Sequence, residues 1–419
     1  MTLTTGRASP SLLSLAGLGW FTGALFFFYA WVLRVAPSIM VEELMRDFAV
    51  GGAVLGNLSA FYFYGYAGMQ VPIGLLLDRF GPRRLMTAAA IVCAFGCVLF
   101  GISGTLVQAS AGRFLIGASA AFSLVGAMAV AGQWFPTQRF ALLSGLAMMM
   151  GMAGGVFGQA PLRFAVAAFD WRTTMVLLSG GGVALALASW AFVRDRQRGT
   201  GGLGAMLAGL ARVSRNRQTW LCAIAGMGAG GPLLGFASLW CVPYLEATKG
   251  LDRTTAAAIA SVMFIGWGAG APVFGWLSDR IGRRKPPFMA GLAMSGAAMA
   301  AIVYLPGLAV GAIAVLCFLT GLGGSAQIVC FALAREHNPV ALSGTTIGLV
   351  NGMLTGAGAL YQPLIGWMLD RAWDGRMLAG ARIYDAGAYR SALAIVLVGC
   401  LAGFLATLMV RETHCRQQQ

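Results

Sequence analysis

Two arginines lie inside long apolar runs, and they are the residues of this sequence best suited to chemistry. Arg34 lies in YAWVLRVAPSIM, and Arg113 lies in AGRFLIGASA. All fourteen acidic residues fall in predicted loops or at predicted helix ends, so neither arginine has an acid beside it in the membrane. A guanidinium in apolar surroundings needs compensation, which a carboxylate or phosphate supplies through two parallel hydrogen bonds. The two arginines therefore predict a binding site for a small organic anion.

Each arginine also has a structural interpretation. Arg34 closely precedes Pro37, so its side chain can instead extend toward the outer membrane surface. Arg113 can instead bond backbone carbonyl groups of the first or fifth predicted helix. An ionisable residue within a membrane span is nevertheless a functional-site hypothesis by default.

Polar side chains are available to complete such a site. Tyr62, Tyr66 and Gln70 recur every four residues and therefore share one face of a helix. The second half of the chain contributes Gln327 and Asn351. We predict that these five residues bind the substrate together with the two arginines. Anchoring at the membrane interface or a hydrogen bond between helices is the alternative for each of them.

The composition places these residues in a lipid bilayer. The chain has 419 residues, is 58% hydrophobic and 10% charged, and has a mean hydropathy of +0.76, which is typical of a polytopic membrane protein. Its 60 glycines suit the close approach of helices in lipid. The net charge of +15 lies in short segments between apolar runs, without a basic stripe of interleaved aromatics, so nucleic-acid binding is not predicted.

Apolar runs long enough to span a bilayer recur along the whole chain, each of about 20 residues or more. Twelve such runs lie at about 14–40, 52–77, 85–104, 106–132, 140–166, 173–193, 219–244, 255–277, 287–305, 308–333, 343–368 and 391–410. We predict an all-α membrane protein with two pseudo-symmetric bundles of six helices. The predicted parts are an N-terminal bundle (1–193), a basic cytoplasmic linker (194–218) with a short amphipathic helix, and a C-terminal bundle with a short tail (219–419).

The distribution of basic residues predicts the orientation of the chain. If the N-terminus is inside, the inner segments carry about twice as many lysines and arginines as the outer segments. An even number of spans then places both termini in the cytoplasm. The expected location is the inner (plasma) membrane, with the lipid bilayer as the surrounding partner.

One charged segment occurs twice, each time after the second apolar run of a half. GLLLDRFGPRR at 74–84 aligns without a gap with GWLSDRIGRRK at 275–285. An aspartate at the end of a helix can pair with a nearby arginine and face the N-terminus of a neighbouring helix. We predict a conformational lock that forms in one access state and breaks in the other. Its residues are Gly74, Asp78, Arg79, Gly81 and Arg83 in the first copy and Gly275, Asp279, Arg280, Gly282 and Arg283 in the second.

The alternative for both copies is a segment that only sets membrane orientation, although basic residues alone would achieve that. Pro82 stands in the first copy where the second has Arg283, so we expect the two copies to differ there. A third stretch, PLIGWMLDR at 363–371, resembles PVFGWLSDR at 272–280 but ends on the opposite side of the membrane. Chance and an inverted sub-repeat both explain it.

The two charged segments resemble both copies of the G-x-L-x-D-R-x-G-R-R signature of the major facilitator superfamily. AGRFLIGASA similarly resembles its second signature, with Arg113 and Gly117 kept and Ser119 at the last glycine. The resemblance covers the whole chain and implies alternating-access transport by a protein that is by default a monomer.

Residues 62–81, YFYGYAGMQVPIGLLLDRFG, are similar to the organic-anion symporters of that superfamily, the anion:cation symporter group. In that group a cavity arginine follows Y-x-D, so Arg34 in WVLR inherits the anchoring role by resemblance. Leu33 stands in place of the aspartate, and Ala120 and Ala121 replace acids that assist proton coupling. Coupling to a proton, coupling to sodium, uniport and exchange therefore all stay open.

Other functions fit the sequence less well. A drug exporter typically carries a Gly-Pro signature in the fifth helix, where GLAMMMGMAGGVFG has none. A peptide or amino-acid carrier would need an acid to pair the substrate amine, and a non-transporting receptor or assembly partner would not need both charged segments. No nucleophile–base pair or metal-ligand cluster is present in the sequence, so we predict no enzyme, no cofactor and no metal.

Overall fold

The computed structural model describes residues 14–70, 72–195 and 203–418. The N-terminal residues 1–13, residue 71 and residues 196–202 of the predicted linker lie outside the described residues. The side chains of Gly74 and Asp78 also lie outside the description, although their backbone belongs to a helix.

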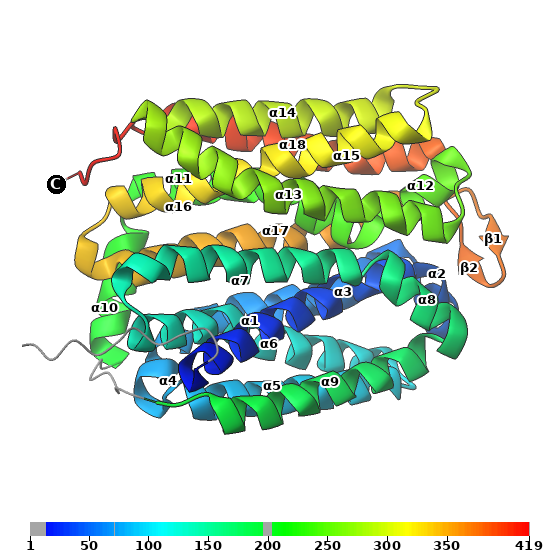
Figure 1. Cartoon of the computed structure of the whole chain (residues 1–419). Coiled ribbons are helices and arrows are strands. Elements are labelled where there is room, and N and C mark those ends of the chain that lie inside the picture. Colours follow the sequence, from blue (N-terminus) through cyan, green and yellow to red (C-terminus); the bar gives the residue numbers. More distant parts are fainter. Residues whose placement is uncertain (1–13, 71, 196–202, 419) are drawn as a thin grey trace, which may run out of the picture.

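Long helices run side by side along one axis (Figure 1). The first half and the connecting segment contain α1 (Leu15–Val35), α2 (Val41–Phe48), α3 (Gly52–Gln70), α4 (Pro72–Phe80), α5 (Pro82–Gly101), α6 (Leu106–Trp134), α7 (Thr137–Phe157), α8 (Ala160–Phe169), α9 (Trp171–Phe192) and α10 (Leu203–Ser214), with the 3-10 turn η1 (Ala36–Ile39). The amphipathic helix predicted in the linker corresponds to α10.

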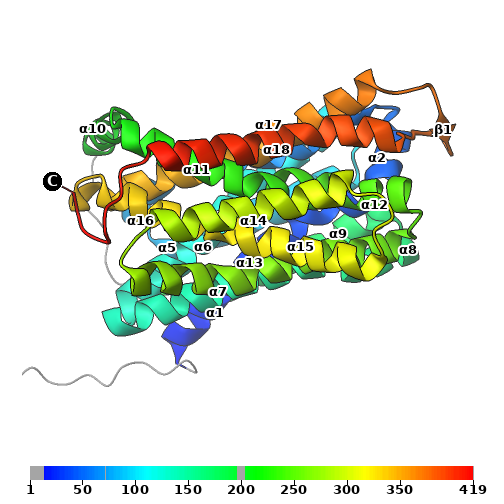
Figure 2. The same ribbon diagram turned by 90° about the horizontal axis from the view of Figure 1, so that it is seen from above.

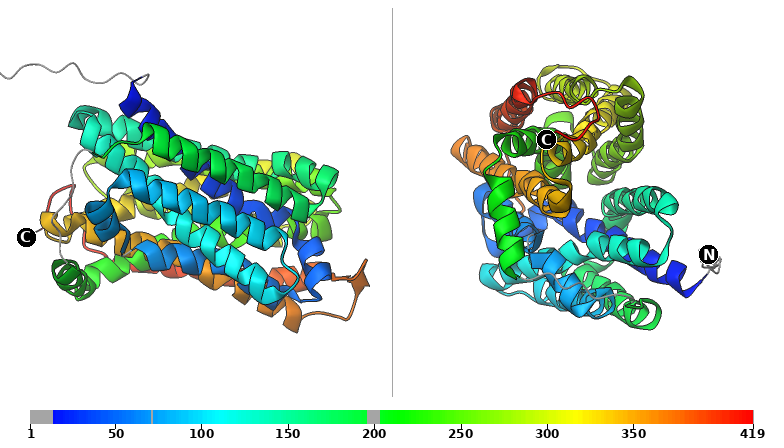
Figure 3. Two further views of the ribbon diagram at one scale, coloured as in Figure 1. Left: turned by 90° about the horizontal axis from the view of Figure 1, so that it is seen from below. Right: turned by 90° about the vertical axis from the view of Figure 1, so that its left-hand side faces the viewer.

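The second half repeats this plan with irregular insertions. It contains α11 (Arg217–Gly231), the π-helix η2 (Pro232–Trp240), α12 (Cys241–Lys249), α13 (Arg253–Ile281), α14 (Lys285–Tyr304), α15 (Val310–Gly324), η3 (Ser325–Gln327), α16 (Ile328–Glu336), η4 (Val340–Leu342), α17 (Ser343–Arg371), β1 (Met377–Leu378), β2 (Ala381–Arg382) and α18 (Ala386–Met409). The end-on view in Figure 3 shows the helices in two groups, one from each half.

The helix content confirms an all-α membrane protein. Ten helical segments of the described chain are long and apolar enough to span a membrane, and the bent pair Leu142–Phe157 and Ala160–Phe169 makes an eleventh. The remaining predicted span, 52–77, corresponds to α3 and α4, which residue 71 separates. The observed helices are therefore consistent with twelve spans.

The two ends of the bundle differ in what they carry. One end holds both charged segments, α10 and the C-terminus, and we call it the signature end (left in Figure 1). The other end holds α2, α8, α12 and the β1–β2 hairpin, which projects past the helices in Figure 2, and we call it the strand end. Each long helix connects these two ends.

Glycines let equivalent helices touch in both halves. A Cβ added at Gly117 of α6 would overlap the carbonyl oxygen of Tyr62 in α3. A Cβ added at Gly321 of α15 would overlap the carbonyl oxygen of Met263 in α13 in the same way. Only glycine permits such backbone approach. The internal repeat therefore extends from the sequence to the packing of helices.

Candidate functional site

Arg113 donates hydrogen bonds to backbone carbonyl groups near the end of the first helix. Pro37 has no N–H group, so the carbonyl of Leu33 lacks its usual helical donor. The Arg113 Nη1 atom donates to the Leu33 carbonyl at 2.8 Å, and Nη2 donates to the carbonyl of Ser59 in α3 at 3.3 Å. Arg113 is 1% exposed. The geometry matches the structural alternative, because this arginine joins α1, α3 and α6.

Arg34 lies in an aromatic cage instead. Its guanidinium carbon lies 4.1 Å from the ring centre of Trp31, 4.8 Å from that of Tyr66 and 5.2 Å from that of Tyr62. Phe63 adds a fourth ring at 5.9 Å. The quadrupole of each ring attracts the cation by about 0.5–2 kcal/mol, depending on desolvation. Helix periodicity correctly placed Tyr62 and Tyr66 together, since their rings stack with centres 6.2 Å apart.

No acid balances Arg34 among the described residues. Its side chain forms no ion pair there, and its buried Nε atom has no hydrogen-bond partner. Only 4% of the residue is exposed, so the side chain does not extend to the membrane surface. A buried cation without an acidic partner is costly unless a ligand compensates its charge. The cage therefore holds a buried cation that has no acidic partner among the described residues.

The predicted amides lie in two places. Asn351 of α17 donates to Gln70 of α3 at 3.1 Å, so this pair joins the two halves. The Nε2 atom of Gln70 is buried without a partner, as is the Oε1 atom of Gln327 at η3. Within the described residues Gln327 makes no polar contact with the other predicted site residues. These two unpartnered amide atoms are available to hydroxyl or carboxyl groups of a ligand.

Sequence reasoning missed the contribution of the second half to the cage. Phe264 of α13 packs edge-on against Trp31, with ring centres 6.1 Å apart. Gln159, at the break between α7 and α8, accepts from Ser38 at 3.0 Å and donates to the Ala237 carbonyl of η2 at 3.2 Å. The sequence could have indicated Trp31 as a contact of Arg34, because Trp31 lies one helical turn before it. No sequence pattern indicated Phe264 or Gln159, since their partners are distant in the chain.

The π-helix is held by backbone contacts. The indole nitrogen of Trp240 donates to the Gln362 carbonyl at 3.0 Å, and the Gln362 amide donates to the Leu234 carbonyl at 2.9 Å. Tyr244 donates to the Ile302 carbonyl at 2.7 Å. Both aromatic residues are fully buried. π-helical segments occur frequently at functional sites, and this one packs against α17.

Both charged segments turn at a glycine in the left-handed region. Gly81 has φ +79° and Gly282 has φ +67°, which explains a glycine at this position in each copy. Beyond the turns the copies differ. Arg83 donates from Nε to the carbonyl of Trp190 at 2.9 Å, whereas its counterpart in the second copy, Arg284, is 9% exposed and forms ion pairs.

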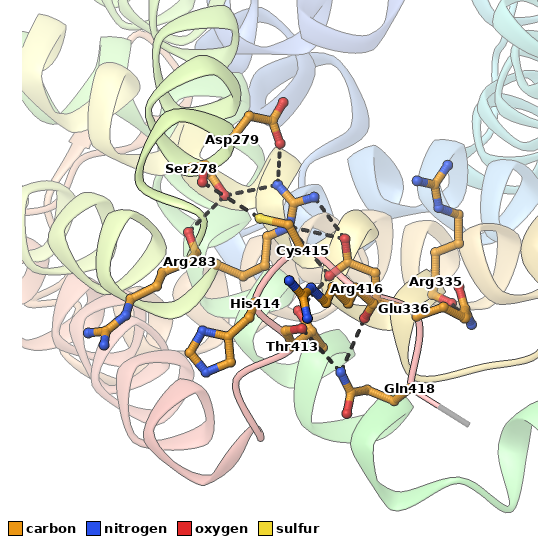
Figure 4. A network of polar contacts seen from close by, with 12 residues as sticks. Ser278, Asp279, Arg283, Arg335, Glu336, Thr413, His414, Cys415, Arg416 and Gln418 are labelled. Carbon is orange, nitrogen blue, oxygen red and sulfur yellow. Dashed lines mark hydrogen bonds and ion pairs between the residues drawn. The ribbon is translucent and has the colours of Figure 1, made fainter.

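The second copy is a network centred on Arg284, which the sequence prediction did not include. Arg284 pairs with Asp279 at 2.6 Å and with Glu336 at 2.7 Å, and it donates to Ser278 at 3.0 Å. Figure 4 shows Ser278, Asp279 and Glu336 gathered with the C-terminal tail, where Thr413 donates to Glu336 at 2.5 Å. The ion pairs of this network stay within the second half.

Among the side chains that the structure describes, those of the other predicted residues form no ion pair in this network. Arg280 stacks on Trp276 at 5.0 Å, and Arg79 lies 5.4 Å from the ring centre of Phe80. Arg283 is exposed, and its carbonyl accepts from Ser278. Gly275 faces open space. The roles of these residues in a lock stay predictions.

An acid after the last helix of each half caps the helix that follows the charged segment. Asp195, in Val193-Arg194-Asp195, accepts from the backbone N–H of Arg83 at 2.9 Å. Glu412, in Val410-Arg411-Glu412, accepts from the N–H groups of Arg284 at 2.8 Å and Lys285 at 2.9 Å. The repeated Val-Arg-acid triplet was a visible signal that sequence reasoning overlooked.

Glu412 makes the stability of the signature end depend on pH. Partial burial raises its pKa, but N–H donors of Arg284, Lys285, His414 and Thr413 outweigh burial and leave the pKa of Glu412 below its ordinary value of 4.5. Its stabilisation is present above the unfolded-state pKa and disappears as pH falls through the lower folded-state pKa. Glu412→Gln should therefore lower Tm at neutral pH and have a vanishing effect at about pH 3. An equal Tm difference at both pH values would contradict this role.

The comparisons with known proteins agree with this architecture. A sequence profile described as Major Facilitator Superfamily matches residues 20–241 and 241–419. The chain belongs to the major facilitator superfamily and is a membrane transporter, not an enzyme, as the sequence predicted.

The chain is 23% identical over 380 residues to the uncharacterized transporter YybO of Bacillus subtilis, covering 80% of this chain and 83% of that protein. It is 23% identical over 403 residues to the probable galactarate/D-glucarate transporter GudP of Escherichia coli, covering 84% and 86% respectively. The fold is similar to that of a bacterial homolog of the human lysosomal transporter Spinster, solved in an inward-facing and unoccupied conformation. The TM-score is 0.76 at 16% identity, covering 95% of this chain and 98% of that one.

Proposed function

We propose that this protein is a secondary active transporter that carries a small organic anion across the inner membrane by alternating access. Carboxylates and sugar acids are the proposed substrate class. The observation that carries the proposal is Arg34, a buried guanidinium in an aromatic cage with no carboxylate beside it among the described residues. An anionic substrate supplies the missing charge, so its binding offsets the desolvation cost of the buried guanidinium.

The chemistry of the cage supports recognition of a carboxylate. The rings of Trp31, Tyr66 and Tyr62 lie against the guanidinium, and a carboxylate can bind a guanidinium through two parallel hydrogen bonds. The indole nitrogen of Trp31 is buried without a partner and offers another donor. The unpartnered amide atoms of Gln70 and Gln327 suit hydroxyl groups along a polyol chain. Arg113 serves this site indirectly, by holding α1 against α3 and α6.

The relatives support the same class. GudP is named for galactarate and D-glucarate, which are dicarboxylic sugar acids, and the similarity extends over most of both chains. We further propose that the signature end faces the cytoplasm, because it carries the linker and both basic segments. The coupling ion stays unassigned, since the described membrane spans place no acid beside Arg34.

A matched ligand panel tests the substrate class on the purified full-length protein. We expect galactarate or D-glucarate to raise the thermal stability, by about 2.7 kcal/mol at a ligand concentration 100 times Kd. Galactitol has the same carbon skeleton without carboxylates and is the control. Stabilisation by galactitol or by a cationic amine, but by neither diacid, would overturn the proposal. Uptake of the stabilising anion into proteoliposomes then separates a transporter from a receptor that binds without transport.

A further inference from the structure

We propose that Asp370 is a conformational lock at the strand end, which joins the two halves there and releases when the protein opens at that end. The proposal rests on the alternating access proposed above but is independent of the substrate. It gives a role to the PLIGWMLDR stretch, whose resemblance to the charged segments otherwise has no explanation.

The carboxylate of Asp370 caps a helix of the opposite half. It lies in the last turn of α17, and its two oxygens accept from the backbone N–H groups of Gly52 and Ala53, each at 2.9 Å. These are the first residues of α3, where N–H groups have no helical partner and the helix dipole favours a negative charge. The contact therefore bridges the second half and the first half through charge-assisted bonds.

Neighbouring residues hold the carboxylate in place. Tyr384 donates to Asp370 at 2.6 Å and itself accepts from the N–H group of Gly52 at 2.9 Å. Arg382 of β2 pairs with Asp370 at 3.1 Å. A Cβ added at Gly51 would lie against the Asp370 and Arg382 side chains, so the sequence Gly51-Gly52 leaves room for this cluster.

The lock has a mirrored counterpart on the same pair of helices. α3 and α17 run antiparallel, because Gly52 lies against Gly366 at one end and Gln70 lies beside Asn351 toward the other. The α4 helix that follows α3 contains Gly-x-x-x-Asp78-Arg just before its last residue, and α17 ends in Gly-x-x-x-Asp370-Arg. The same Gly-x-x-x-Asp-Arg pattern therefore occurs near the C-terminal end of each member of this antiparallel pair.

Asp370 fills the strand-end position, and the side chain of Asp78 lies outside the described residues. Leu342, the N-cap residue of α17 at the signature end, supplies no side-chain hydrogen bond to the helix. The ion pairs that join the two halves within the described residues also lie at the strand end, where Arg253 of α13 pairs with Glu43 at 2.8 Å and with Glu42. We infer a reciprocal device, in which Asp370 engages when the strand end is closed and Asp78 engages when the signature end is closed.

Hydrogen exchange of the ligand-free protein tests this inference at both ends at once. In Asp370→Asn, exchange in residues 52–58 should become at least about tenfold faster, since hydrogen bonds to a charged acceptor contribute about 1.5–3 kcal/mol. At the same time, exchange in residues 343–348 at the signature end should become slower. The remaining Arg253 pairs keep the variant folded, and Tyr384→Phe should change both ends in the same directions by a smaller factor.

Asp374→Asn is the matched control. Asp374 is a second aspartate at the strand end, but it is exposed and its ion pair is with the nearby Arg376 of the same half, at 2.6 Å. We expect no change at either end in this variant. Faster exchange at the strand end without slower exchange at the signature end would reduce Asp370 to an ordinary helix cap and overturn the lock. Because no ligand is present, this result does not depend on whether the substrate is an anion.

Discussion

Arg34→Ala should weaken binding of the stabilising anion by roughly 100-fold or more, because a carboxylate loses two charge-assisted hydrogen bonds of about 1.5–3 kcal/mol each. Arg34→Lys keeps the charge but loses the planar fork, so its affinity should fall between those of the wild type and the alanine variant. Isothermal titration of the purified variants measures both. The experiment follows directly from the cage of Trp31, Tyr62 and Tyr66 around the guanidinium.

The stability of the same variants separates binding from folding. Removing a buried cation that has no acid beside it should leave the Tm of the unliganded protein unchanged or raised. Arg212→Ala, on the exposed face of α10, is the control and should change neither affinity nor Tm. Wild-type affinity in Arg34→Ala would remove this residue from the site. A large fall in Tm would instead show that Arg34 stabilises the fold.

Gly117→Ala should destabilise the protein by about 3 kcal/mol, the upper end of the usual cost of overpacking. The added methyl group meets the carbonyl of Tyr62, which is backbone and cannot rotate away. Separation of α6 from α3 would also move Arg113 and Tyr62 apart, so anion binding should fall together with Tm. Thermal unfolding monitored by intrinsic fluorescence provides the measurement.

Two further glycine variants serve as comparisons for Gly117→Ala. Gly321→Ala places a methyl group against the Met263 carbonyl of the second half and should lower Tm to a similar extent. Gly180→Ala, on the exposed face of α9 with nothing near the added Cβ, should change stability by less than about 1 kcal/mol. An equal loss in all three variants would point to general intolerance of alanine, not to helix contact.

The two charged segments also differ in the contacts of a residue other than Pro82. Pro82 corresponds to Arg283, which is exposed, so this difference touches no ion pair. The second copy contains the buried ion pair of Arg284 with Glu336. At the position of Glu336 the first half has a glutamine, because Gln133-Trp134-Phe135-Pro136 corresponds to Glu336-His337-Asn338-Pro339. A neutral glutamine cannot form the ion pair that the glutamate forms.

Helix periodicity predicted correctly which residues of a single helix lie on the same face. The spacing of Tyr62 and Tyr66 put both rings on one face, and they do contact the same cation. Predictions about partners were harder. Asp279 was expected to pair with an arginine of its own segment, and the partner is Arg284, but Glu336 and Thr413 join it from segments distant in the chain.

The sequence by itself determined the membrane class, the repeated halves and the superfamily, because hydropathy, the spacing of apolar runs and doubled motifs are local properties of the chain. It did not determine which of its two membrane arginines is free. Arg34 and Arg113 lie in similar apolar runs, and what distinguishes them is the surface that each meets across a helix contact. Arg113 donates to backbone carbonyl groups of α1 and α3, including the Leu33 carbonyl left open by Pro37, whereas Arg34 lies against aromatic rings with no acid beside it among the described residues. That difference exists only once α1, α3 and α6 are packed.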